Sequence, residues 1–222
     1  MVDKGMEIDG LGDVEVENTA AESLLVKDVT IMLLGIDSSG SMDDYTGVMK
    51  RELENFKIAI SGSPEKDRIL VARADFSDFV NIEGYKKIGD FRTTFDPTAR
   101  TRLYDTIVDG GNKLIQYADY LSLNGVRVKA VFAIFSDGLD NLSKNTIRDA
   151  AVVVKTLKER EVVTVFVSFG ESTGVAKNLG FKNVLGLGRS GDELKRAFNV
   201  LGQGIVAQSA APRPMVDDFL DQ

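Results

Sequence analysis

The sequence predicts a three-layer α/β fold, in which helices cover both faces of a mostly parallel, doubly wound sheet with one antiparallel edge strand. Apolar runs of strand length alternate along the chain with segments whose apolar residues recur at helical spacing. Most of the strand-like runs are too continuously apolar for a sheet with one face in water. A layer of helices is therefore expected on each side of the sheet.

The individual elements follow from these two periodicities. The expected strands are residues 29–36, 68–76, 129–135, 162–169 and 183–187. Residues 80–85 and 86–91 are expected to form an antiparallel excursion, an edge hairpin around Glu83-Gly84. Helices are expected where four apolar stripes occur, within residues 49–60, 107–121, 147–157 and 194–205. Ser190-Gly-Asp-Glu193 has the spacing of a capping box and is expected to begin the last of these helices.

The predicted domain spans residues 23–207 and has an extension at each end. Residues 1–22 are acidic and weakly patterned, and we expect an N-terminal acidic extension there. Residues 208–222 begin with prolines and small residues and end in an acidic and apolar stretch. We expect a flexible tail, because chain ends are usually loose. The alternative for residues 215–221 is a short docking peptide for a partner.

Composition limits the chemistry that the chain can perform. A net charge of −7 over 222 residues, with a pI near 4.8, argues against general electrostatic binding of nucleic acid. The chain has no cysteine, which excludes disulfides, thiolate nucleophiles and sulfur-ligated metals. It also has no histidine, which excludes Ser-His-Asp catalysis and removes the commonest zinc ligand. Any metal must be held by oxygen atoms.

The sequence contains no evident targeting or membrane segment. The first 18 residues are acidic and lack the basic start and apolar core of a secretory signal. No apolar run approaches the ~20 residues that a membrane span requires. We therefore expect a soluble, cytoplasmic protein.

The most informative motif is Asp37-Ser38-Ser39-Gly40-Ser41, which directly follows the first expected strand. It places one carboxylate and two hydroxyls on a single loop at the carboxyl edge of the sheet, where ligands of parallel α/β sheets gather. Hard oxygen ligands in this arrangement suit Mg²⁺. The alternative is a helix-entry loop in which the serines cap backbone N–H groups. For the nearby Asp43 and Asp44, a capping role at the first helix is favoured.

Two later segments complete a pattern with this motif. Thr101 lies in Thr101-Arg102-Leu103-Tyr104-Asp105, and Asp137 lies in Phe135-Ser136-Asp137-Gly138, after a central strand. Together with Asp37, Ser39 and Ser41, they resemble the metal-ion-dependent adhesion site (MIDAS) of the von Willebrand factor A (vWA) domain family, over roughly residues 25–206. The fold that this resemblance implies is the Rossmann-like α/β fold already predicted.

The resemblance also implies roles for the five residues. Ser39 and Ser41 would bind the ion through their hydroxyls, and Thr101 would do so in one conformational state. Asp37 and Asp137 would act mainly through ordered waters. Because carboxylates in the second shell leave the ion incompletely neutralised, a Glu or Asp from a partner protein can complete its coordination. Mg²⁺ is the expected ion, with Mn²⁺ or Ca²⁺ as alternatives.

The chain departs from the family pattern before Thr101. Many relatives have a pair of glycines there, whereas this chain has Thr98-Ala99-Arg100 before Thr101 and Arg102 after it. Arg100 and Arg102 are candidate partner-binding residues, because a guanidinium can bind a carboxylate bidentately. The alternative is that both are ordinary surface charges. Thr98 is the alternative ligand if the register of the loop is shifted.

Three functions compete at this point. The leading hypothesis is a non-enzymatic, Mg²⁺-dependent protein-binding module whose partner belongs to a larger intracellular assembly, such as a AAA-type ATPase. The second is a metal-dependent phosphohydrolase with Asp37 as nucleophile, although Ser39 stands where haloacid-dehalogenase-type enzymes have a second Asp. The third is a structural assembly subunit that keeps the fold and binds no metal.

Overall fold

The computed structural model describes residues 27–222 except residues 99, 171, 189–190, 217–218 and 221–222. Its centre is one seven-stranded sheet with the strand order β3-β2-β1-β5-β6-β7, to which β4 adds by pairing with β2. The β1, β2, β5, β6 and β7 strands are parallel, whereas β3 and β4 run antiparallel to β2. This arrangement confirms the predicted fold class. The strands are β1 (Asp28–Asp37), β2 (Ile69–Phe76), β3 (Val80–Ile82), β4 (Lys86–Lys87), β5 (Arg127–Ser136), β6 (Val163–Phe169) and β7 (Asn183–Leu187).

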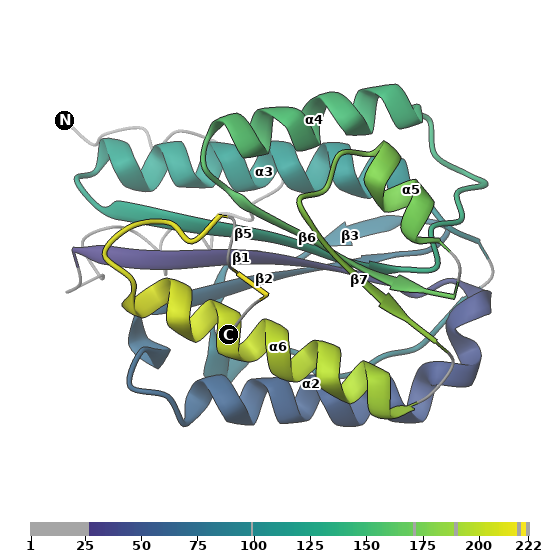
Figure 1. The fold of residues 1–222 in the computed structure, drawn as a ribbon, viewed down its shortest axis with the longest axis horizontal. Coiled ribbons are helices and arrows are strands. Elements are labelled where there is room, and N and C mark those ends of the chain that lie inside the picture. The colour runs from purple at the N-terminus through teal and green to yellow at the C-terminus, as the bar shows by residue number, and fades with distance from the viewer. Residues whose placement is uncertain (1–26, 99, 171, 189–190, 217–218, 221–222) are drawn as a thin grey trace, which may run out of the picture.

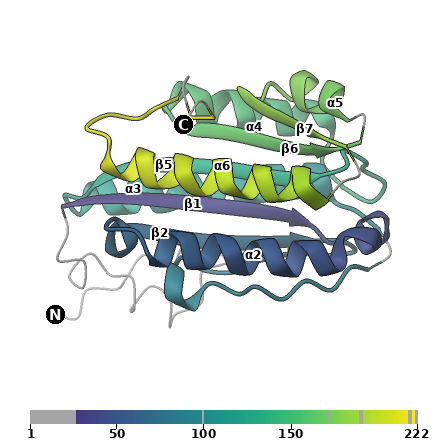
Figure 2. The same cartoon turned by 60° about the horizontal axis from the view of Figure 1, so that its bottom comes forward.

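Helices cover both faces of the sheet (Figure 1). The α2 and α6 helices lie side by side on one face, and α3 and α4 lie on the other with the short α5 (Figures 1 and 2). The α-helices are α2 (Thr46–Ser61), α3 (Leu103–Leu123), α4 (Ile147–Glu159), α5 (Thr173–Asn178) and α6 (Gly191–Ala210). Three 3₁₀ segments are also described: η2 (Gly40–Tyr45) directly precedes α2, and η3 (Lys66–Arg68) and η4 (Ile88–Asp90) lie between α2 and α3. The sequence did not predict α5, which at six residues is too short to show a helical period.

The central strands supply alternate residues to two separate cores. Met32, Leu34 and Ile36 of β1 pack in the core under α2 and α6. Ile31 and Leu33 of the same strand pack in the core under α3 and α4. Because successive side chains of a strand point to opposite faces, a strand that serves both cores has to be apolar throughout. This explains the continuous apolar runs from which the fold was predicted.

The antiparallel edge differs from the prediction in its pairing. The expected hairpin between residues 80–85 and 86–91 does not form, because β3 and β4 each pair with β2. Val80 lies opposite Phe76, and Lys87 lies opposite Leu70, so residues 80–87 run along a single edge of β2. Tyr85, between the two short strands, is 4% exposed and stacks on Tyr117 of α3 with ring centroids 4.3 Å apart. This contact holds the segment in line along β2.

The C-terminal residues also differ from the expected flexible tail. The α6 helix continues past residue 207 to Ala210, and Phe219 beyond it is fully buried in the core under α2 and α6. Phe219 packs so closely on Gly204 that a Cβ at Gly204 would lie 2.8 Å from the ring. The Met215 N–H donates to the Gln208 side-chain oxygen at 2.8 Å. The chain beyond α6 therefore folds back onto that helix.

Two other expectations lie outside the described residues. These are the N-terminal acidic extension, residues 1–22, and the capping box that begins at Ser190. Neither can be compared with the structure.

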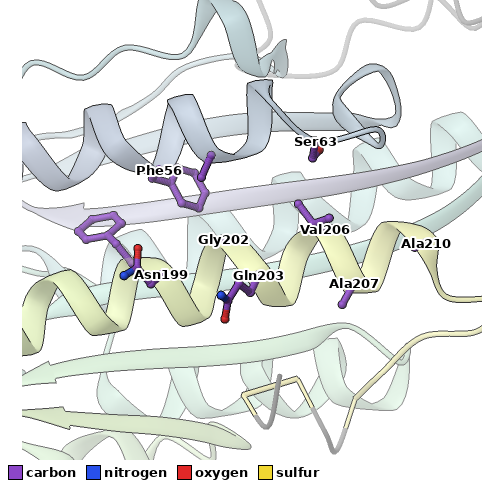
Figure 3. Close-up of a pocket in the computed structure, with 10 residues that line it drawn as sticks. Phe56, Ser63, Asn199, Gly202, Gln203, Val206, Ala207 and Ala210 are labelled. Carbon is purple, nitrogen blue, oxygen red and sulfur yellow. The ribbon is translucent and has the colours of Figure 1, made fainter.

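An apolar groove of about 580 Å³ separates the C-terminal halves of α2 and α6 (Figure 3). Phe56 and Ser63 line it from the α2 side, and Gly202 and Val206 line it from α6. The parallel strands end near the N-terminal ends of these helices, so the groove lies away from the carboxyl edge of the sheet (Figure 2).

Candidate metal centre

The first part of the site is the junction between the ends of β1 and β5. Asp37, the last residue of β1, is fully buried. Its Oδ2 accepts a hydrogen bond from the Ser136 hydroxyl at 2.6 Å, and its Oδ1 accepts the Ser39 N–H at 3.0 Å. Both carboxylate oxygens are therefore held in position by the protein. This carboxylate is suited to orienting its neighbours rather than to reaching outward.

The hydroxyls of Ser39 and Ser41 point to a common place, with their oxygens 3.1 Å apart. Ser39 occupies the N-cap position of η2, yet its side chain makes no capping hydrogen bond. The alternative in which this serine caps a helix is therefore wrong. The capping role favoured for Asp43 and Asp44 at the first helix is also wrong, because the N-cap of α2 is Tyr45 and no side-chain capping bond is formed there.

The loop before α3 is fixed against both other parts of the site. The Thr98 N–H donates to the Ser38 carbonyl at 2.6 Å, which joins this loop to the one after β1. The Thr101 N–H donates to the Asn141 side-chain oxygen at 3.1 Å, and the Leu142 N–H donates to the Thr101 carbonyl at 3.1 Å. Together with the bond between Ser136 and Asp37, these contacts connect the three loops in a closed ring. The structure thus brings the three motif segments together.

Thr101 carries a polar atom with no partner among the described residues. Its side chain is 2% exposed, and its Oγ1 accepts and donates no hydrogen bond there. Leaving a buried hydroxyl unsatisfied costs about 1–3 kcal/mol, so such an atom calls for a further partner, such as an ordered water or a metal ion. Thr98 is exposed by contrast and contacts the neighbouring loop through its backbone. The geometry therefore favours Thr101 over Thr98 as the ligand.

Asp137 lies in a tight turn directly after β5. Its Oδ1 accepts the Leu139 N–H at 3.0 Å, and its side chain is half-buried. The turn depends on Gly138, which has a φ of +77° and whose Cβ would lie 2.6 Å from the Cβ of Ser172. A side chain at position 138 would be strained and would collide, so this position is restricted to glycine.

The charge of Asp37 is poorly compensated by the protein alone. Burial, with a smaller contribution from Asp137, raises the pKa of this carboxyl from 3.8 to about 6, although hydrogen bonds from Ser136 and Ser39 act to lower it. A positive charge nearby would favour the ionised form. Among the described residues, no group of three or more acidic side chains is placed to hold a metal ion. A metal here would therefore have to use hydroxyl ligands beside the two carboxylates.

The two candidate partner-binding arginines differ in their surroundings. Arg102 donates to the Asp105 carboxylate at 2.9 Å and to the Asp78 carbonyl at 2.7 Å, and its side chain is 20% exposed. These contacts assign Arg102 to holding the loop in place. Arg100 is exposed and remains a candidate for contact with a partner.

Several residues that support the site were not predicted from the sequence as doing so. Asp140 accepts the Tyr104 N–H at the start of α3 at 2.9 Å, and Asn141 holds Thr101. Asp105 accepts the backbone N–H groups of Lys144 and Asn145. The sequence gives turn chemistry at these positions but not the distant partners that the side chains contact.

The sequence matches no protein-family model and no curated protein. Solved structures do resemble it. The von Willebrand factor domain of the type V pilus tip protein Mfa5 from Porphyromonas gingivalis matches with a TM-score of 0.56 and 10% identity, over 85% of this chain and 98% of that one. The fold is that of a vWA domain. At this level of identity the likeness concerns the fold alone.

Two further structures with this vWA-like fold belong to longer proteins. The pilus adhesin SpaC from Lactobacillus rhamnosus GG matches with a TM-score of 0.64 and 14% identity, over 82% of this chain and 30% of that one. Proximal thread matrix protein 1 from the mussel byssus, with a zinc-occupied MIDAS motif, matches with a TM-score of 0.55 and 16% identity. That match covers 82% of this chain and 46% of the mussel protein. The chain therefore spans less than half the length of these two proteins.

Proposed function

We propose that this vWA-fold chain is a non-enzymatic, Mg²⁺-dependent protein–protein interaction module whose MIDAS-type site binds an acidic residue of a partner. The observation that carries the proposal is the buried hydroxyl of Thr101, which has no hydrogen-bond partner within the described part of the chain. It lies on a loop that is hydrogen-bonded to the segment presenting the paired hydroxyls of Ser39 and Ser41.

The residues present fit a hard divalent cation. Ser39, Ser41 and Thr101 would supply neutral hydroxyl oxygens, and Asp37 and Asp137 would supply negative charge. The hydrogen bond from Ser136 already holds the Asp37 carboxylate in place. Asp37 would therefore orient the ligands around the ion and leave the open coordination position to the partner's carboxylate. When bound, the ion supplies a positive charge and a coordination position for a partner's Glu or Asp. The mussel protein's zinc-occupied motif supports a divalent ion at such a site, and we propose Mg²⁺ here, with Mn²⁺ or Ca²⁺ as substitutes.

The partner and the compartment remain proposals. We propose that the partner is a protein component of a larger assembly, such as a AAA-type ATPase, and that the chain acts in the cytoplasm. Among the helices that the structure describes, none is long and apolar enough to cross a membrane.

The geometry favours binding over phosphohydrolase chemistry. A nucleophilic carboxylate has to reach the phosphorus atom of its substrate. Asp37 is fully buried and both of its oxygens accept hydrogen bonds. The third function, a structural subunit without metal, assigns no ligand to the paired hydroxyls of Ser39 and Ser41.

Affinity capture from the host lysate, run in parallel with Mg²⁺ and with EDTA, tests the proposal. Wild type should retain a partner only in Mg²⁺, and Asp37→Ala and Ser39→Ala should lose it. Ser122→Ala is the matched control, because this serine is exposed at the far end of α3 and should behave as wild type. A partner that the two site variants retain in Mg²⁺ would refute the proposal.

A further inference from the structure

The groove between α2 and α6 is an apolar surface that the candidate metal centre does not use (Figure 3). None of the ten described residues that line it carries a charge. A Cβ at Gly202 would meet the ring of Phe56 at 3.6 Å, which is an ordinary contact distance. The missing side chain at Gly202 therefore leaves room that an apolar group can fill without collision. A contiguous apolar surface of this kind is expected to bind an apolar segment.

The chain enters the described fold at one end of this groove. Lys129 of β5 donates through Nζ to the carbonyls of Ser209 at 2.5 Å and Ala211 at 2.7 Å, at the C-terminal end of α6. The Ser209 hydroxyl donates to the carboxylate of Glu65, just past the end of α2, at 3.1 Å. Asp28, the first residue of β1, lies opposite the residue two positions before Lys129. The β1 strand therefore begins where α2 and α6 both end (Figure 2).

The segment that precedes β1 combines negative charge with apolar residues. The first 22 residues contain seven acidic residues and one lysine, so they carry −6 of the net charge of −7. Residues 14–26 alone contain five large apolar residues, which are Val14, Val16, Leu24, Leu25 and Val26. These residues are the part of the segment next to β1, so they are tethered to the end of the groove.

The length and the charge of residues 14–26 match the groove. From Ala210 to Asn199, α6 rises about 17 Å, at 1.5 Å per residue. An extended chain covers that distance in about five residues, at a rise of about 3.3 Å each. Lys195 and Arg196 are exposed one turn before Asn199, at the end of the groove away from β1. A segment running from β1 along the groove would therefore bring its acidic residues toward two basic side chains.

We propose that residues 14–26 fold back onto the chain and occupy the α2/α6 groove. Their apolar side chains lie in the groove, and Glu15 and Glu17 lie toward Lys195 and Arg196. This inference does not depend on the metal centre, which is at the opposite edge of the sheet. A second copy of the chain is the alternative occupant, and the experiment separates the two.

Paramagnetic relaxation in the full chain tests the proposal. The chain has no cysteine, so a single introduced cysteine carries the only spin label. Gln203→Cys places the label at the groove, because Gln203 is exposed and lines it. The amide signals of residues 14–26 should lose most of their intensity. Val152→Cys is the control, since Val152 is 59% exposed on α4, on the other face of the sheet, and its label should leave those signals unchanged (Figure 1).

A mixed sample identifies which chain supplies the segment. Isotope-labelled chain without the spin label is combined with unlabelled Gln203→Cys chain that carries it. Residues 14–26 should keep their intensity in this mixture. A loss of intensity there would show that a second copy fills the groove and would overturn the proposal.

A matched pair of substitutions gives a second readout without any spin label. Ala59→Asp introduces a charge into the groove, because Ala59 is exposed and lines it, and should shift the amide signals of residues 14–26 by displacing the segment. Ile58→Asp is the control, since Ile58 is the neighbouring residue on α2, 60% exposed, and does not line the groove. Signals of residues 14–26 that respond neither to the label at position 203 nor to Ala59→Asp would overturn the inference.

Discussion

The Ser136 hydroxyl donates to the Asp37 carboxylate at 2.6 Å and so joins the ends of two strands whose residues are 99 apart in the chain. Ser136 also accepts the Gly138 N–H at 3.0 Å. One hydroxyl therefore fixes the orientation of Asp37 and the start of the turn that carries Asp137. The two carboxylates of the candidate centre are positioned by the same side chain.

If Ser39 helps to hold a divalent ion, Ser39→Ala should lose stabilisation by Mg²⁺. At 100 times its Kd, a ligand stabilises the folded state by about 2.7 kcal/mol, or roughly 5–10 °C in a domain of this size. Wild type should show this rise in melting temperature with Mg²⁺, and EDTA should reverse it. A Ser39→Ala protein with the full Mg²⁺ response would contradict the assignment. Ser122→Ala, at the far end of α3, should respond as wild type.

Thr101→Val removes a buried hydroxyl that has no partner among the described residues. Without metal, the variant should be at least as stable as wild type, with a gain of at most about 3 kcal/mol, because an unsatisfied polar group is lost. Its Mg²⁺ response should be weakened. Chemical denaturation with and without Mg²⁺ measures both quantities.

Thr106→Val is the matched control for Thr101→Val. Thr106 is also fully buried, but its hydroxyl donates to the Arg102 carbonyl at 2.8 Å. This variant should lose about 1 kcal/mol of stability and keep its Mg²⁺ response. The assignment of Thr101 would be wrong if the two valine variants behaved alike.

Asp105→Asn should destabilise the protein in a pH-dependent way. Burial acts to raise the pKa of Asp105, but hydrogen bonds from Asn145, Lys144 and Arg102 outweigh it and hold the pKa below 3.8. The stability that the carboxylate contributes is therefore present above the unfolded pKa and is lost as the pH falls through the folded one. The variant should be about 2–3 kcal/mol less stable at pH 7, from the loss of charge-assisted hydrogen bonds.

Urea denaturation of wild type and Asp105→Asn across acidic to neutral pH measures this difference. The gap in free energy of unfolding should shrink once the pH falls below about 4, the range of an ordinary Asp. Asp90→Asn, exposed in η4 and distant from Asp105 in the sequence, should stay within about 0.5 kcal/mol of wild type at pH 7. A constant gap at every pH would show that the charge of Asp105 does not contribute.

Phe219→Ala tests whether the chain beyond α6 is part of the folded domain. Phe219 is fully buried against Gly204, so its truncation should cost about 3 kcal/mol of stability. Phe79→Ala is the control, because Phe79 is 79% exposed and should change stability little. Thermal unfolding of the full chain with each substitution gives the comparison. An unaffected Phe219→Ala protein would return residues 211–222 to the status of a loose tail.

The fold could be predicted because the apolar patterns of the individual strands and helices match the faces that these elements bury in the folded protein. The strands that serve both cores are apolar throughout, and the stripes of α2, α3, α4 and α6 face those cores. The pairing of β3 and β4 could not be predicted, since it depends on Tyr85 stacking on Tyr117 of a distant helix. The burial of Phe219 depends likewise on the room that the missing side chain of Gly204 leaves for its ring. A local sequence pattern gives no information on such a contact.

For the site, the order of the motif segments predicted which loops would meet. It did not predict that Ser136 would orient Asp37, or that Arg102 would form an ion pair with Asp105. Both facts depend on side-chain directions across loops that are far apart in sequence. The identity of the ligands therefore remains a prediction that the geometry supports.

The most direct measurement of the central claim is the anomalous diffraction of crystals of the full chain grown in Mn²⁺. The account predicts one strong peak in contact with the hydroxyl oxygens of Ser39 and Ser41, on the side that Thr101 and Asp137 border, and no such peak in Ser39→Ala crystals. Crystals in which this place has no anomalous peak at saturating Mn²⁺, or in which the peak persists in Ser39→Ala, would contradict it.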